Sequence, residues 1–100
     1  MNIFLLNFSR NTEFRNQFTK GEHNITEENE NGNFAYQVVA ELKPDLIFVN
    51  YDSKPSHCRQ TILAINKRKS TNNIPTFFVG GKPSEIDKVI DLGMNIKLNR

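Results

Sequence analysis

The sequence predicts an α/β protein built on a doubly wound parallel sheet, and two features of the chain lead to this prediction. Leu46 to Val49 is an apolar run that leaves no polar side chain for a solvent face, as in a parallel strand covered on both sides. Parallel strands need crossover helices between them. Apolar residues at helical spacing flank this strand, at Ala35, Val38, Val39 and Leu42 before it and at Cys58, Ile62 and Ile65 after it.

The chain begins with a strand predicted over Ile3 to Phe8, which is apolar almost throughout and is therefore expected to be central. Ser9 or Asn11 can cap the short helix that follows. In that helix Phe14 and Phe18, one turn apart, form the only apolar pair. The helix is therefore expected to bury few side chains.

A polar strand is predicted next, over His23 to Glu27. Only Ile25 is available for burial there, which an edge position in the sheet tolerates. The acidic stretch Glu27 to Glu30 then leads through Asn31-Gly32 into the second helix, which is predicted over Asn33 to Leu42.

The second half of the chain repeats the alternation of helix and strand. The third helix is predicted from near Pro55 to about Lys69, and the fourth strand over Ile74 to Val79. Pro83 suits the first residue of a fourth helix and Gly93 suits its exit. The buried stripe of this helix is expected to consist of Ile86, Val89 and Ile90, and a last strand is predicted over Asn95 to Leu98.

Five strands thus alternate with four helices. Right-handed connections, together with an edge position for the polar second strand, predict the strand order 2-1-3-4-5. The chain shows no repeat, linker or low-complexity tract, so residues 1–100 are expected to form a single domain.

Composition narrows the function classes. The net charge is +2, and the basic residues are dispersed except for Lys67 to Lys69, so no nucleic-acid partner is expected. A single cysteine, Cys58, excludes an internal disulfide and fits a reducing compartment. The chain has no apolar run of membrane-spanning length and no signal-peptide pattern, so we expect a cytoplasmic protein with no membrane partner.

Three stretches resemble the receiver domains of bacterial response regulators. Lys43 to Val49, Lys-Pro-Asp-Leu-Ile-Phe-Val, is similar to the stretch that enters a receiver's phosphorylated strand. Ile74 to Val79 is similar to the fourth strand, and Gly93 followed by Asn95 to the turn before the fifth. The resemblance implies a flavodoxin-like, receiver-like three-layer sandwich with a five-stranded parallel sheet.

The residues at the receiver's active-site positions depart from the family pattern. The position of the phosphorylated aspartate is Asn50, and an amide cannot supply the carboxylate nucleophile of an acyl phosphate. The acidic pair after the first strand is matched by Asn7 and Phe8, so poor or no magnesium binding is expected. Gly80 replaces the small hydroxyl residue that ends the fourth strand. The resemblance therefore implies a pseudo-receiver without aspartyl phosphorylation, metal or cofactor.

Asp52 is an acidic residue near the end of the central strand. It provides a third hypothesis for the function, in which the chain is a receiver phosphorylated atypically on Asp52. It lies two residues beyond Asn50, in the loop, and has no acidic neighbours to hold a metal ion. An Asp followed by Ser53 more often reflects turn chemistry.

The length of the chain suggests a contact surface. A receiver continues into a fifth helix that packs beside the first, and here that last helix is missing. Strands one, three and four should then be only partly covered on that face, and exposed apolar surface of this kind marks an association site. We expect a homodimer or a protein partner at Phe14, Phe18 and the neighbouring sheet, with Glu85 to Leu98 as a second surface.

The alternative function is a small-molecule site for a corrinoid or a nucleotide. A glycine pair at the end of a buried parallel strand lets a ligand approach the backbone, or simply makes the turn before Pro83. Val79-Gly80-Gly81 also resembles the last strand of cobalamin-binding domains, although the Asp-x-His-x-x-Gly signature is missing. The rim of such a site would consist of Asn7, Ser9, Asn50, Asp52, Ser53, Gly80 and Gly81.

Catalysis is not expected. His57 and Cys58 are adjacent, and neighbouring helical side chains point about 100° apart, which is poor geometry for a nucleophile and its base. No carboxylate pair, metal-ligand spacing, nucleophile elbow or phosphate loop is found. The sequence therefore predicts a non-catalytic regulatory or scaffolding interaction module.

Overall fold

The computed structural model describes residues 1–9, 12–19, 21–92 and 96–99, the last four by their backbone alone. Asn11, predicted as a helix cap, Gly93, predicted as a helix exit, and Asn95, predicted as the start of the last strand, are not among the described residues. The elements are β1 (Asn2–Leu6), α1 (Thr12–Asn16), β2 (Asn24–Glu28), α2 (Gly32–Leu42), β3 (Leu46–Asn50), α3 (Pro55–Lys67), β4 (Thr76–Val79), α4 (Pro83–Asp91) and β5 (Ile96–Asn99).

All strand pairs in the sheet are parallel, and the strand order is β2-β1-β3-β4-β5. Leu5 of β1 lies opposite Glu27 of β2 on one side and opposite Phe48 of β3 on the other. The alternation of strands and helices and the parallel order β2-β1-β3-β4 confirm the prediction, and the backbone of β5 pairs with β4. This arrangement is consistent with a flavodoxin-like fold.

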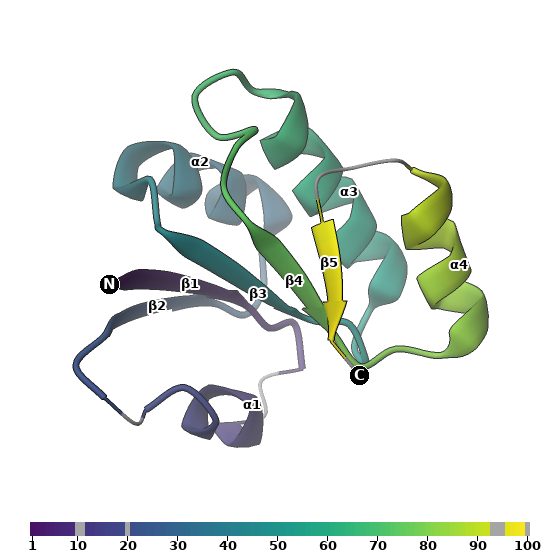
Figure 1. Ribbon diagram of the computed structural model, residues 1–100, viewed down its shortest axis with the longest axis horizontal. Coiled ribbons are helices and arrows are strands. Elements are labelled where there is room, and N and C mark those ends of the chain that lie inside the picture. Colours follow the sequence, from purple (N-terminus) through teal and green to yellow (C-terminus); the bar gives the residue numbers. More distant parts are fainter. Residues whose placement is uncertain (10–11, 20, 93–95, 100) are drawn as a thin grey trace.

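The helices cover the two faces of the sheet unequally (Figure 1). α2, α3 and α4 lie on one face, and α1 lies on the other. Successive strand residues point to opposite faces, so Phe4 and Leu6 join the larger core while Ile3 and Leu5 face α1. The larger core contains Phe4, Leu6, Phe8, Ala35, Val39, Ile47, Val49, Tyr51, Cys58, Ile62, Ile65, Phe78, Ile86 and Val89.

The α1 face is covered in one part and open in another. Phe48, Phe77 and Val79 on β3 and β4 are only partly buried, as predicted. The same prediction is wrong for β1, because Ile3 and Leu5 are 5% and 0% exposed. They are covered because α1, short as it is, packs against β1.

Phe14 provides that cover. Its side chain is 5% exposed and packs with Ile3 and Leu5. Phe14 is therefore a core residue of the α1 face, and its predicted placement on an exposed contact surface is wrong. Phe18, the other residue predicted there, is only partly buried and rests on Phe48, with ring centroids 4.6 Å apart.

Local chemistry sets the ends of α2. The Asn31 side-chain oxygen accepts hydrogen bonds from the backbone N–H groups of Asn33 and Phe34, at 2.9 and 3.1 Å, and so caps the helix. At the other end Lys43 adopts a left-handed conformation, with φ 48°, and donates its N–H to Val39.

The buried stripe of α4 is narrower than predicted. Ile86 and Val89 are 2% and 0% exposed, whereas Ile90 is 58% exposed, so the placement of Ile90 in the stripe is wrong. On a helix, Val89 and Ile90 lie on opposite sides of Ile86, about 100° apart. α4 packs against the larger core through Ile86 and Val89, and this rotation of the helix leaves Ile90 facing solvent.

Candidate functional site

Three predicted rim residues meet where β1 and β3 end. Asn7 follows β1 directly and Asn50 is the last residue of β3, and the two strands are neighbours in the sheet. The Asn50 side-chain amide donates to Asn7 Oδ1 at 2.9 Å and to Ser9 Oγ at 3.3 Å. The structure therefore brings Asn7, Ser9 and Asn50 together, as the sequence predicted for residues at the carboxyl ends of adjacent strands.

Asn7 is the centre of this cluster. Its Oδ1 atom also accepts a hydrogen bond from the Ser9 hydroxyl at 2.6 Å, and its Nδ2 atom donates to Glu27 Oε2 at 2.9 Å. Asn7 is fully buried and Asn50 is 9% exposed. We call Asn7, Ser9, Glu27 and Asn50 the strand-end network. Buried amides need such partners, and this network supplies them from the protein itself.

The chemistry open to the strand-end network is limited. Its two central groups are amides, which offer neither a nucleophilic carboxylate nor an anionic metal ligand. Glu27 is its carboxylate, and one oxygen of Glu27 already accepts the Asn7 amide. Among the described residues, no three His, Cys, Asp or Glu side chains are grouped so that they could hold a metal ion.

Asp52 is tied to the glycine pair. Its Oδ1 atom accepts the backbone N–H of Gly81 at 2.7 Å, and its own N–H donates to Asn50 Oδ1 at 3.2 Å. Gly80 and Gly81 both have positive φ, 81° and 97°. A Cβ atom on Gly80 would lie 2.7 Å from Asp52 Cγ, and one on Gly81 would lie 2.5 Å from Tyr51 Cδ2.

The glycine pair therefore makes room for the protein's own side chains. Asp52 and Tyr51 occupy the space next to Gly80 and Gly81 that the alternative hypothesis gave to a corrinoid or a nucleotide. Ser53 is also separate from the network, since no hydrogen bond links its side chain to Asn7 or Asn50 in the described part of the chain. These contacts give no support to a ligand at this rim.

A second polar cluster, which the sequence analysis missed, ties β3 to two helices. The buried Tyr51 hydroxyl donates to the Glu85 carbonyl at 2.7 Å and accepts from Arg59 Nη1 at 2.8 Å. Arg59 also pairs with the Glu85 carboxylate. Burial raises the pKa of Tyr51, and the hydrogen bond from Arg59 lowers the pKa of Glu85. We call Tyr51, Arg59 and Glu85 the tyrosine tie.

Cys58 and His57 do not form a catalytic pair. Cys58 is fully buried, and desolvation raises its pKa to about 12, so the nucleophilic thiolate is not available. Its sulfur atom lies 3.6 Å from the Asn50 carbonyl oxygen. The exposed His57 ring makes an edge contact with Phe8, with centroids 5.6 Å apart. Cys58 is therefore a core residue.

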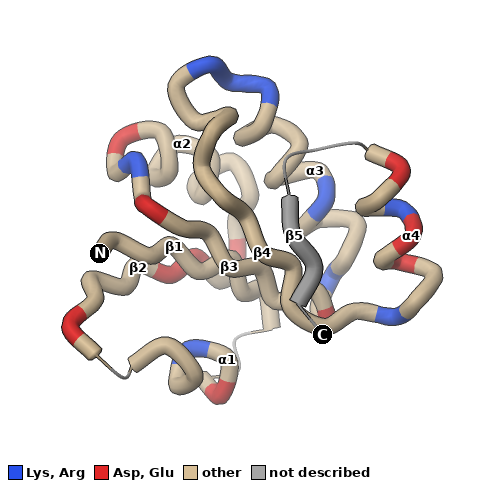
Figure 2. Tube along the Cα trace, viewed as in Figure 1, with Lys and Arg blue, Asp and Glu red and all other residues tan. Residues whose placement is uncertain are grey.

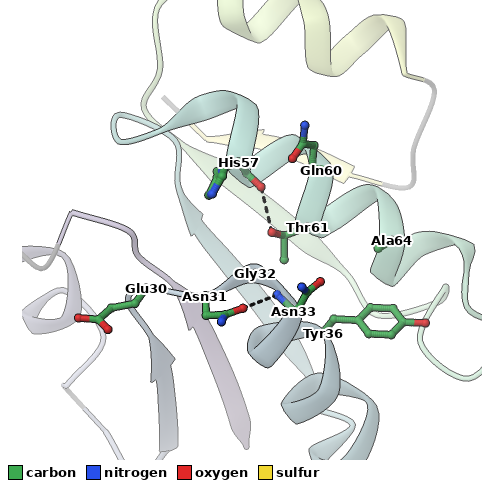
Figure 3. Close-up of a pocket in the computed structure, with 9 residues that line it drawn as sticks. All are labelled: Glu30, Asn31, Gly32, Asn33, Tyr36, His57, Gln60, Thr61 and Ala64. Atoms are coloured by element: carbon green, nitrogen blue, oxygen red, sulfur yellow. Dashed lines mark hydrogen bonds between the residues drawn. The ribbon is translucent and has the colours of Figure 1, made fainter.

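A groove of about 510 Å³ lies between α2 and α3 (Figure 3). A Cβ atom on Gly32 would overlap the Thr61 hydroxyl, so this glycine is what lets the two helices touch. The sequence analysis missed the groove, and the only local signal was a glycine directly after the Asn31 cap. The groove is lined by Glu30, Asn31, Gly32, Asn33, Tyr36, His57, Gln60, Thr61 and Ala64.

Neither a scan against protein-family models nor a search of curated proteins finds a match for this chain. No helix among the described residues has both the length and the apolar character needed to cross a bilayer.

Proposed function

We propose that this chain is a non-catalytic regulatory or scaffolding module, a pseudo-receiver whose strand-end site is held in one state. The observation that carries the proposal is the 2.9 Å hydrogen bond from Asn50 to Asn7. The receiver resemblance puts a phosphate acceptor at the first position and a metal ligand at the second. Here the two side chains bind each other.

The chemistry of the strand-end network supports a fixed state. Addition of a phosphoryl group to a receiver requires an anionic oxygen and a cation to offset the phosphate charge, and two buried amides supply neither. Because the Asn50 amide donates to Asn7 and Ser9 and the Asn7 amide donates to Glu27, the network needs no ligand to be stable. A surface that a receiver exposes conditionally would then be held permanently in one form.

The contact surface that fits this role is a row of phenylalanines on the α1 face, Phe18, Phe48 and Phe77, which we call the aromatic row. Ring centroids are 4.6 Å apart between Phe18 and Phe48 and 5.2 Å apart between Phe48 and Phe77. All three side chains are only partly buried. Aromatic side chains contribute strongly to protein interfaces, so this row is suited to a protein partner or a second copy.

Phosphoryl uptake tests the first part of the proposal. The chain is incubated with acetyl phosphate and Mg²⁺, and its intact mass is measured, with Asp52→Asn as the companion variant. We expect no added phosphoryl group on either protein. Uptake that disappears in Asp52→Asn would establish the atypical receiver instead and would overturn this proposal.

Association tests the second part. Sedimentation velocity over a range of concentrations should show a complex that Phe77→Ser weakens, while Phe34→Ser leaves it unchanged. Phe34 is the matched control because it is 56% exposed on α2, on the opposite face of the sheet. A chain that stays monomeric and binds no protein partner would remove the aromatic row from the proposal.

A further inference from the structure

We propose that the groove between α2 and α3 binds an extended peptide segment of a partner protein. This inference rests on the proposed function, because it gives the interaction module a second surface besides the aromatic row and names the kind of ligand that this surface binds. It draws on the shape of the groove and on the polar side chains around it.

The shape of the groove suits a short stretch of extended chain. His57, Gln60, Thr61 and Ala64 follow the spacing of one helix face and form one side of the groove. They extend along α3 for about 10 Å, at 1.5 Å per residue. About three residues of an extended peptide span that length. The volume of about 510 Å³ lies within the range of known ligand sites.

The side chains around the groove offer hydrogen bonds that the protein does not use. Asn33 on α2 and Gln60 on α3 both line the groove (Figure 3). Neither side-chain amide has a hydrogen-bond partner among the described residues, and the same is true of the His57 ring. An amide carries both a donor and an acceptor, which matches the paired N–H and C=O groups of a peptide backbone.

The apolar contacts of the groove are small and lie at one end. Tyr36 projects from α2 near Ala64 of α3 (Figure 3), and the Arg68 guanidinium lies 4.1 Å from the centre of the Tyr36 ring. This contact holds the ring in place and adds a cation–π attraction. The exposed part of Tyr36 together with Ala64 can accommodate one small apolar side chain of the peptide.

Two comparisons favour a peptide over a small organic ligand. Small-molecule sites enclose most of the ligand among apolar side chains, whereas the lining here is mainly polar. The strand-end network is also polar, but there each amide is bonded to the protein. In the groove the Asn33 and Gln60 amides have no such partner among the described residues, and so they are available to the backbone groups of an extended chain.

The experiment selects peptides from a phage-displayed library of random heptapeptides against the full chain and then measures the affinity of each selected peptide by calorimetry. Ala64→Trp fills the groove, and Asn33→Ala combined with Gln60→Ala removes its amides. Gln37→Trp, at an exposed position of α2 outside the groove lining, is the matched control. Both groove variants should weaken binding about tenfold or more, and the control should not.

Failure to select any peptide with saturable binding would overturn the groove proposal. Equal binding to the native chain and to Ala64→Trp would overturn it too. If such peptides instead lose affinity in Phe77→Ser, the interaction module stands and its surface is the aromatic row. The variant with both Asn33→Ala and Gln60→Ala should fold normally, because its substitutions are at exposed positions and remove no hydrogen bond that the described residues make. A loss of peptide binding in this variant can therefore be assigned to the missing amides.

Discussion

At the scale of single residues, the buried pair Asn7 and Asn50 depends on one donor. The Asn50 Nδ2 group donates to Asn7 Oδ1 at 2.9 Å and to Ser9 Oγ at 3.3 Å. We predict that Asn50→Asp destabilises the fold by about 1–3 kcal/mol at neutral pH, because it removes the donor and places a charge beside a buried acceptor. Urea unfolding measures the change.

The chain provides a matched control for this substitution. Asn24 also donates its side-chain amide to another asparagine, Asn2, at 3.1 Å, but this pair is exposed. Asn24→Asp should change the free energy of unfolding by less than about 0.5 kcal/mol, as expected of surface substitutions. Equal effects at the two positions would show that burial of the Asn7–Asn50 pair does not matter.

The glycine pair allows a second prediction at the residue scale. Gly81→Ala should cost about 1–3 kcal/mol in backbone strain, since φ is 97°. It should cost more than Gly80→Ala, because the new Cβ would press on the fully buried ring of Tyr51, whereas at Gly80 it would meet the exposed Asp52 carboxylate.

A double-mutant cycle checks this explanation by urea unfolding. In an Asp52→Ala background the cost of Gly80→Ala should fall, because the obstructing carboxylate is gone. The cost of Gly81→Ala should change less, since Tyr51 remains in place. A cycle in which Asp52→Ala does not reduce the cost of Gly80→Ala would leave backbone conformation as the whole cause at Gly80.

At the scale of elements, the tyrosine tie joins β3, α3 and α4 through charged and uncharged hydrogen bonds. Arg59 lowers the pKa of Glu85 below its ordinary value of 4.5. A carboxyl group whose pKa is lower in the folded state stabilises the fold above its ordinary pKa, and this contribution is lost as the pH falls through the folded pKa. Acid should therefore weaken the attachment of α4.

The prediction is measured as the difference in unfolding free energy between the native chain and Glu85→Gln. The native chain should be the more stable at about pH 7, and the difference should shrink at an acidic pH below the lowered pKa of Glu85. Glu41→Gln, on the exposed side of α2, should change stability little at either pH. A Glu85→Gln difference that is the same at both pH values would mean that the carboxylate charge contributes nothing.

The same elements show what sequence patterns can and cannot predict. Leu46 to Val49 predicted a strand buried on both faces, and β3 is central in the sheet. The burial of Ile86 and Val89 followed from helical spacing, but Ile90 fits that spacing equally well. Which of them faces the sheet depends on how α4 is rotated, and packing decides that rather than periodicity.

The candidate sites show the same limit. Asn7, Ser9 and Asn50 could be grouped from the sequence because adjacent parallel strands end at one edge. Glu27 could not be added to them, because its position depends on the register that places it opposite Leu5. The groove could not be predicted at all, since it exists only where Gly32 of α2 meets Thr61 of α3.

Charge is scattered over the whole molecule. Acidic and basic residues are interspersed along most of the chain, and the basic run at the end of α3 is short (Figure 2). No large field of one sign is expected from such a pattern. Apolar and hydrogen-bonding surfaces, such as the aromatic row and the groove, are therefore better candidates for recognition than charge.

The two faces of the sheet differ in how firmly they are covered. Three helices pack on the larger core, whereas the other face is covered by α1, a helix of five residues. A helix this short is not stable by itself and depends on its packing, which comes chiefly from Phe14. Local opening of α1 should therefore cost much less free energy than global unfolding.

Hydrogen exchange, measured by NMR, tests this difference. Amides within α1 should exchange orders of magnitude faster than those of β1 and β3, whose exchange should follow global unfolding. Phe14→Ala should speed exchange in α1 further and expose Ile3 and Leu5, while exchange in α3 should follow only the overall loss of stability. If α1 amides are protected as strongly as those of β3, the chain unfolds as one unit. The sheet beneath Phe14 would then never be open to a partner.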